Sequence, residues 1–106
     1  MLFIDEEVQA KFHKLPALLQ VVCQILEGIL SEHLVQLEVI ECEKKFGMSI
    51  VMLGASCEEA VLKDAADQVN ARFPRKDKKS TCVIESEENG IMTIRVSNLE
   101  DLSQVQ

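Results

Sequence analysis

Few side chains in this sequence could act as a base or a nucleophile. There are two histidines and four cysteines, which are His13, His33, Cys23, Cys42, Cys57 and Cys82. A hydrolase of the serine or cysteine type needs a nucleophile, a base and a group that orients the base. Both histidines fall in the N-terminal helical part of the chain, and the sequence places neither beside a cysteine. We interpret both as polar-face side chains, predict no catalytic residues, and favour a protein that is not an enzyme.

The cysteines lack the spacing of a zinc site. None of them forms a C-x-x-C pair, and neither histidine lies near a pair of cysteines, whereas structural zinc sites use closely spaced ligands. Each cysteine stands inside an apolar pattern, where a free cysteine behaves as a small hydrophobe. We therefore predict reduced thiols in the core, no metal and no cofactor. Reduced thiols also favour a cytoplasmic protein.

Acidic residues form three close pairs, which are Glu41 with Glu43, Glu58 with Glu59, and Glu85 with Glu87. The second pair begins a predicted helix, where the helix dipole favours negative charge. The other two pairs each share one face of a predicted strand. Solvated surface explains all three pairs, and no spacing typical of an EF-hand occurs.

The size and charge of the chain exclude several classes. The 106 residues carry a net charge of −7, with a pI near 4.8. An acidic surface repels phosphate backbones and anionic lipids, so we expect no nucleic-acid binding and no membrane association. The N-terminus does not resemble a signal peptide, and no run reaches the ~18 apolar residues of a membrane span. We predict one domain over 1–106, in which 97–106 is a partly ordered tail.

The first part of the chain predicts two helices. Asp5 suits the N-cap of a helix that ends near Leu15, and Pro16 suits the first turn of the next. The second helix has a wide apolar stripe, which predicts deep burial. Its apolar residues are Leu18, Leu19, Val22, Cys23, Ile25, Leu26, Ile29 and Leu30.

From about Leu37 the apolar pattern alternates, which predicts a hairpin with strands at 37–43 and 48–53 and a turn ending at Gly47. One face would carry Ile40, Cys42, Ile50 and Met52. Since both faces are partly apolar, the second face is either covered within the chain or meets another chain. The candidate interface consists of Leu37, Val39, Val51 and Leu53.

The rest of the chain predicts a helix and a second hairpin. Ser56 and Glu59 form a capping-box pattern at the start of the helix, and Pro74 ends it. The hairpin has strands near 81–86 and 91–96, with Glu87 opposite Ile91. The connector 72–79 is basic, and we interpret it as solvated. The order α-α-β-β-α-β-β indicates an α+β fold, with two antiparallel hairpins in one sheet and helices packed on one face.

The stretch 49–58 resembles the zinc motif of the D-alanyl-D-alanine carboxypeptidase family, which includes phage endolysins. That motif runs Ser-x-His-x-x-Gly-x-Ala-x-Asp. Ser49 and Gly54 match it, Ser56 and Glu58 are conservative replacements, and Val51 stands where the family has its zinc-binding histidine.

The family's later motif, Glu-x-x-His-x-His, is similar to residues 88–93. Glu88 matches the catalytic base by spacing, whereas Ile91 and Thr93 stand in place of the two histidines. Valine and isoleucine offer zinc no donor atom. The resemblance implies a degenerate, phage-type member of the family that kept the scaffold and lost the metal site.

Three functions are consistent with these observations. The favoured one is a non-enzymatic protein-interaction module that associates with itself, as a homodimer or larger homo-oligomer. An acidic chaperone or inhibitor that binds a basic partner protein is the first alternative. The second alternative is a cell-wall peptidase with an unrecognised site.

Overall fold

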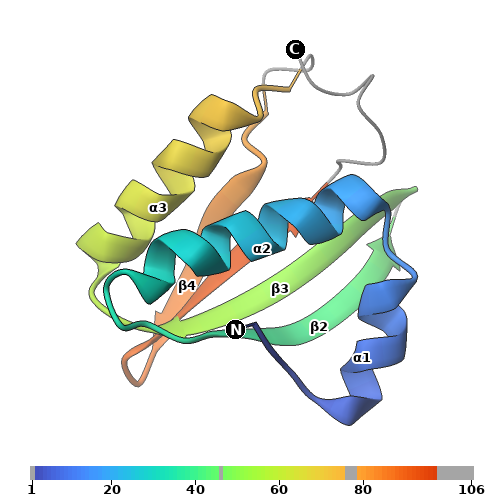
Figure 1. Ribbon diagram of the computed structural model, residues 1–106, viewed down its shortest axis with the longest axis horizontal. Helices are drawn as coiled ribbons and strands as arrows, with labels where there is room; N and C mark the ends of the chain where they lie inside the picture. The colour runs from blue at the N-terminus through green and yellow to red at the C-terminus, as the bar shows by residue number, and fades with distance from the viewer. Residues whose placement is uncertain (1, 46, 76–78, 98–106) are drawn as a thin grey trace.

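The computed structural model describes residues 2–45, 47–75 and 79–97 and shows three helices on one side of a five-stranded sheet (Figure 1). The sheet has the strand order β1-β2-β3-β5-β4. In chain order the elements are β1 (Phe3–Ile4), α1 (Glu6–His13), α2 (Ala17–Ser31), β2 (Leu37–Lys45), β3 (Met48–Ser56), α3 (Glu59–Arg72), β4 (Cys82–Glu88) and β5 (Ile91–Ser97). The predicted α+β fold, with two hairpins in one sheet and helices on one face, is confirmed.

Strand β1 was not predicted, because two residues are too short to show an alternating pattern. It pairs in parallel with β2, through Phe3 opposite Glu38 and Ile4 opposite Val39. The sheet is therefore mixed rather than purely antiparallel. At the other end of the chain, Ser97 belongs to β5 and is buried. The rest of the predicted tail, 98–106, lies outside the described residues.

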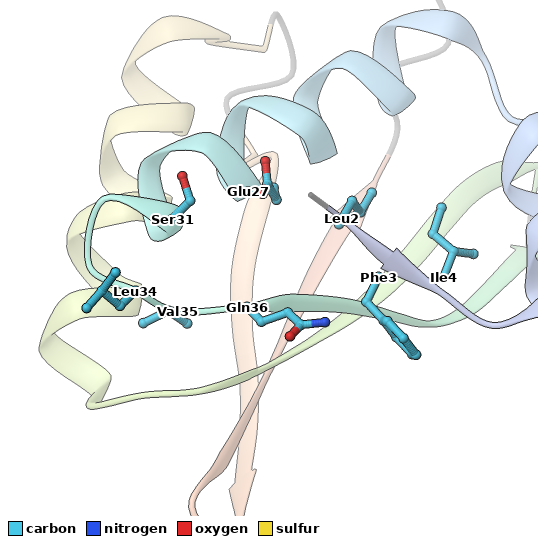
Figure 2. Close-up of a pocket in the computed structure, with 8 residues that line it drawn as sticks. All are labelled: Leu2, Phe3, Ile4, Glu27, Ser31, Leu34, Val35 and Gln36. Carbon is cyan, nitrogen blue, oxygen red and sulfur yellow. The ribbon is translucent and has the colours of Figure 1, made fainter.

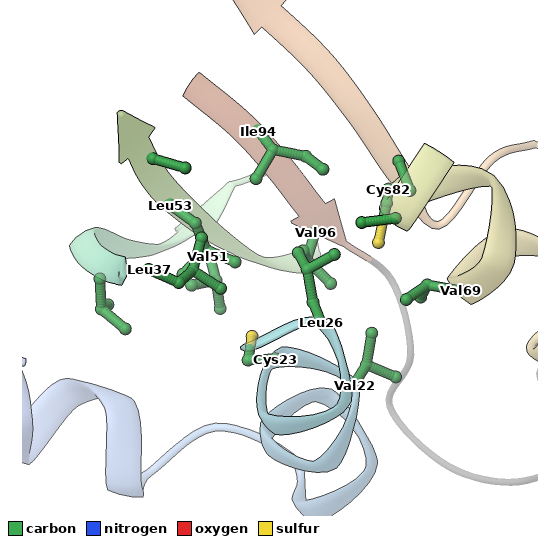
Figure 3. Packing of buried hydrophobic residues seen from close by; sticks show 14 of the residues in the cluster. Val22, Cys23, Leu26, Leu37, Val51, Leu53, Val69, Cys82, Ile94 and Val96 are labelled. Atoms are coloured by element: carbon green, nitrogen blue, oxygen red, sulfur yellow. The ribbon is translucent and has the colours of Figure 1, made fainter. Parts of the chain in front are cut away.

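Helix α2 is the centre of the helical layer. Its stripe was predicted to be deeply buried, and Leu19, Val22, Cys23, Leu26 and Leu30 are indeed enclosed. Figure 3 shows Val22, Cys23 and Leu26 of this helix packed toward Val96 of β5 and Val69 of α3. Since this single cluster joins residues from all three helices and from β2 to β5, it holds the two layers together.

The four residues of the candidate interface form part of this core. Leu37, Val39, Val51 and Leu53 are each 0 or 1% exposed and lie beneath the helices. The prediction that they meet another chain is therefore wrong, because the chain covers them itself. Of the four residues predicted for the other face, Ile40 is 46% exposed and Met52 is partly exposed, whereas Cys42 and Ile50 are buried.

A β-bulge explains why Cys42 was assigned to the wrong face. Val39 lies opposite Leu53 and Glu41 opposite Met52, so Ile40 is an extra residue in β2. Past this bulge the alternation shifts by one residue. Cys42, opposite Val51, therefore points into the core, whereas Ile40 stays on the open face.

The second hairpin also has a tighter turn than predicted. Glu88, rather than Glu87, lies opposite Ile91. The two-residue loop is Asn89-Gly90, and both residues have a positive φ, 55° and 79°, as a type I′ turn requires. A second bulge, between Ile84 and Ser86, shifts the register back. For this reason, the residues that were predicted to point inward do so. They are Cys82, Ile84, Met92, Ile94 and Val96.

The predicted capping box is wrong. Strand β3 continues to Ser56, so the N-cap of α3 is Glu58, and its side chain makes no capping hydrogen bond. Asp5 is the N-cap of α1, as predicted, but it also makes no side-chain capping bond. Both helices therefore depend on packing rather than on a capping side chain.

Asn70 of α3 binds the first residue of the edge strand β4. Its Oδ1 accepts from the backbone N–H of Cys82 at 2.8 Å, and its Nδ2 donates to the carbonyl of Cys82 at 3.0 Å. We expect Asn70→Ala to lower the free energy of unfolding by about 2 kcal/mol, because two partly buried backbone groups lose their partner. Urea unfolding measures this change.

Gln68→Ala is the matched control, since Gln68 only donates to Asp64 on the exposed side of the same helix. It should change stability by less than about 0.5 kcal/mol. Equal losses in the two variants would show that the Asn70 contacts do not hold the edge strand.

Candidate functional site

The two histidines do not face the cysteines. His13 ends α1 and His33 follows α2, and both side chains are exposed. Over the described ranges, no group of three or more His, Cys, Asp or Glu side chains is placed to hold a metal ion.

The cysteines are free thiols, three buried and Cys57 partly buried. Burial raises the pKa of Cys82 to about 12 and raises the pKa of Cys23 further, with smaller contributions from the neighbouring thiols. Burial is also the main reason why the pKa values of Cys42 and Cys57 are raised. Since the thiolate is the nucleophile, these thiols are poor nucleophiles at neutral pH.

The positions that resemble the carboxypeptidase motifs do not converge. Val51 points into the core under the helices. Thr93 lies opposite Gly54, and Ile91 lies opposite Ser56 and Glu88, so both belong to the open face. Side chains at these three positions therefore project from opposite faces of the sheet.

A hollow of about 500 Å³ lies beside β1 and the end of α2. Figure 2 shows Leu2 and Ile4 pointing toward the helices while Phe3 points to the far side of the sheet. At one end stands Leu34, which is 96% exposed and has a φ of 58°. A leucine in this left-handed conformation is disfavoured, and here it forms the turn that closes α2.

A cavity of about 790 Å³ lies between the α1–α2 turn and the adjoining ends of β2 and β3. We call it the basic cleft, because three lysines line it, Lys11, Lys14 and Lys44; Glu41, Glu43 and Ser49 also line it. The cleft was not predicted, since its residues come from separate segments of the chain.

The face of the sheet away from the helices carries exposed apolar side chains. Phe3, Ile40 and Ile91 are 46, 46 and 49% exposed. A Cβ on Gly54 would lie 2.7 Å from Cδ1 of Ile40 and 3.7 Å from Cγ2 of Ile91, so both side chains lie close to the glycine. A shallow hollow of about 270 Å³ joins Gly54, Ile91 and Phe3. We call these four residues the open-face patch.

Carboxylates surround the open-face patch. Strand β2 places Glu38, Glu41 and Glu43 on this face, and β4 adds Glu85 and Glu88. The described strands also place two basic side chains on this face, Lys45 and Arg95. Nε of Arg95 already lies 2.9 Å from Oε1 of Glu85. The face is therefore apolar at its centre and negative around it.

Comparison of the chain with models of protein families, with curated proteins and with solved structures finds no match. No helix in the described parts of the chain is both long and apolar enough to cross a membrane.

Proposed function

We propose that this protein is a non-enzymatic protein-interaction module. Its open sheet face would bind a segment of a partner protein that carries basic side chains beside apolar ones. The observation that carries the proposal is the open-face patch, in which three large apolar side chains remain about half exposed. Contiguous exposed apolar groups rimmed by polar ones mark interaction sites in soluble proteins.

The charges around the patch favour a basic partner over a second copy of this chain. If two copies met face to face, the glutamates of β2 and β4 would be brought together and partly desolvated. Like charges placed together in an interface cost several kcal/mol. A segment with lysine or arginine around an apolar centre meets both requirements of this face, apolar contact and opposite charge.

A synthetic amphipathic peptide, with leucines at helical spacing and lysines between them, tests the proposal. We expect its addition to shift the backbone amide resonances of β2, β3 and β5 around the patch. Ile40→Glu combined with Ile91→Glu should weaken binding about tenfold or more, because two apolar anchors are replaced by charges that need water.

Val21→Glu is the matched control, since Val21 is a comparably exposed apolar residue on α2. It should leave the affinity unchanged. A peptide with glutamates in place of the lysines should not bind. Light scattering should find a monomer, and a dimer that Ile40→Glu separates would contradict the proposal by making a second copy the occupant.

A further inference from the structure

Leu34 stands in the turn that ends α2, at a position where glycine is the usual residue. The N–H of Leu34 donates to the carbonyl of Ser31 at 3.0 Å, and the N–H of Val35 donates to the carbonyl of Leu30 at 3.1 Å. This pair of bonds is a Schellman motif, whose left-handed residue is most often glycine. Leu34 adopts the left-handed conformation with a φ of 58°, although its Cβ makes that conformation unfavourable.

The side chain of Leu34 gains little from the fold that would offset this strain. It is 96% exposed, whereas the neighbouring Val35 packs against the core. A leucine stabilises a protein mainly through the burial of its side chain, and Leu34 makes almost no use of that. Backbone strain of this kind concentrates at functional sites. An exposed leucine in a disfavoured conformation therefore indicates a contact with another molecule.

The hollow beside Leu34 suits an apolar side chain. Its volume is about 500 Å³, and its apolar lining includes Leu2, Ile4 and Val35. In Figure 2, Leu2 and Ile4 point from β1 toward the helices, on the side where α2 ends. Among the described residues that line the hollow, Glu27 is the only one with an ionisable side chain. An occupant should therefore be apolar rather than charged.

The same hollow is continuous with the open-face patch. Phe3 and Gln36 line it, and they also line the shallow hollow of about 270 Å³ that contains Gly54 and Ile91. A chain segment that leaves the open face over Phe3 and Gln36 therefore reaches Leu34. The two-residue strand β1 is short enough for one extended segment to pass around it.

We propose that the partner segment bound on the open face continues past Phe3 and places an apolar side chain in the hollow, against Leu34. This inference rests on the proposed function and adds a second anchor to it. The two surfaces differ in the chemistry they require. The patch is surrounded by carboxylates and attracts basic side chains, whereas the hollow takes an uncharged side chain such as leucine or phenylalanine. The partner segment is therefore basic in one part and apolar in the next.

Two peptides test this second anchor. One is the amphipathic lysine–leucine peptide, and the other is the same peptide extended at both ends by a flexible glycine–serine linker and a Leu-Phe pair. We expect the extended peptide to bind about tenfold more tightly, because the second contact forms within the first complex. It should also shift the methyl resonances of Leu2, Ile4, Leu34 and Val35. A peptide extended by the linkers and paired serines should show no gain.

Leu34→Asn separates the role of the side chain from that of the turn. Asparagine is close to leucine in size, tolerates the left-handed conformation and is not apolar. The variant should keep or raise the unfolding temperature, abolish the gain from the extension, and leave the affinity for the short peptide unchanged. Val21→Asn is the matched control, since Val21 is another exposed apolar residue of α2, and it should leave the gain intact.

Acetyl-Leu-Phe-amide reports on the hollow alone. It should shift the same methyl resonances weakly and saturably, even if the lysine–leucine peptide fails to bind the open face, so the two failures can be told apart. The inference is overturned if this probe leaves those resonances unmoved, or if Leu34→Asn retains the gain. A marked fall in the unfolding temperature of Leu34→Asn would also overturn it, by showing that the leucine serves the fold. So would a dimer that Leu34→Asn separates, because a second copy would then fill the hollow.

Discussion

Leu53→Ala is expected to lower the free energy of unfolding by about 3–5 kcal/mol. Leu53 is fully enclosed, and it lies at the centre of the sheet between Val39 and Ile94. Removing three carbon atoms loses the free energy gained by burying them. It also leaves a cavity that the closely packed layers fill only in part. A domain of this size has about 5–15 kcal/mol of stability, so the variant should be close to unfolding. Urea or thermal unfolding measures the change.

Ile40→Ala is the matched control, because Ile40 is an apolar residue of the neighbouring strand that is 46% exposed. It should cost less than about 1.5 kcal/mol, since much of its side chain is already in water. The pair of variants also separates the two faces of the sheet. If Leu53→Ala were as mild as Ile40→Ala, the burial of Leu53 beneath the helices would be contradicted.

Raising the pH is expected to destabilise the protein strongly. Burial raises the folded-state pKa of Cys82 from 9.0 to about 12, and it raises that of Cys23 further. The fold therefore favours the neutral thiols. Their contribution to stability is fully present below about pH 9 and is lost progressively above it, because the unfolded chain can then release protons that the folded chain retains.

Each such thiol should lower the free energy of unfolding by ~1.4 kcal/mol per pH unit between its unfolded and folded pKa values. The chain has no tyrosine to titrate in this range. Urea unfolding at neutral pH and at about pH 10.5 measures the slope. Cys82→Ala should reduce the slope, whatever it costs in stability at neutral pH. An unchanged slope in this variant would show that the Cys82 thiol is not the titrating group.

The sequence predicted those parts of the fold in which one pattern continues without interruption. The apolar stripe of α2 is wide enough to indicate both a helix and its burial. In the second hairpin, apolar residues alternate with charged or polar ones along each strand. The residues that point inward were therefore predicted correctly, even though the turn was not. In the first hairpin both faces are apolar, so the alternation could not show which face meets the helices.

The candidate sites depend on features that a linear pattern does not contain. The bulge at Ile40 changes which residues of β2 after Val39 point inward, and no glycine, proline or other turn residue in the sequence indicates it. The basic cleft joins Lys11 and Lys14 to Lys44 and Ser49 across a whole helix and a hairpin. Only the packing of α1 beside the edge of β2 brings them together, and that packing follows from the tertiary fold.

The outer strands of the sheet have a consequence for how the protein behaves when concentrated. A long, flat edge strand is a template for fibril growth, since its unpaired backbone groups recruit further chains. At one end of the sheet, β1 is only two residues long and pairs with β2 as far as Val39, and the β2 edge beyond it carries Glu41, Glu43 and Lys44. The other end is β4, whose second half carries Glu85, Glu87 and Glu88. Charged side chains along both edges therefore disfavour the addition of further strands.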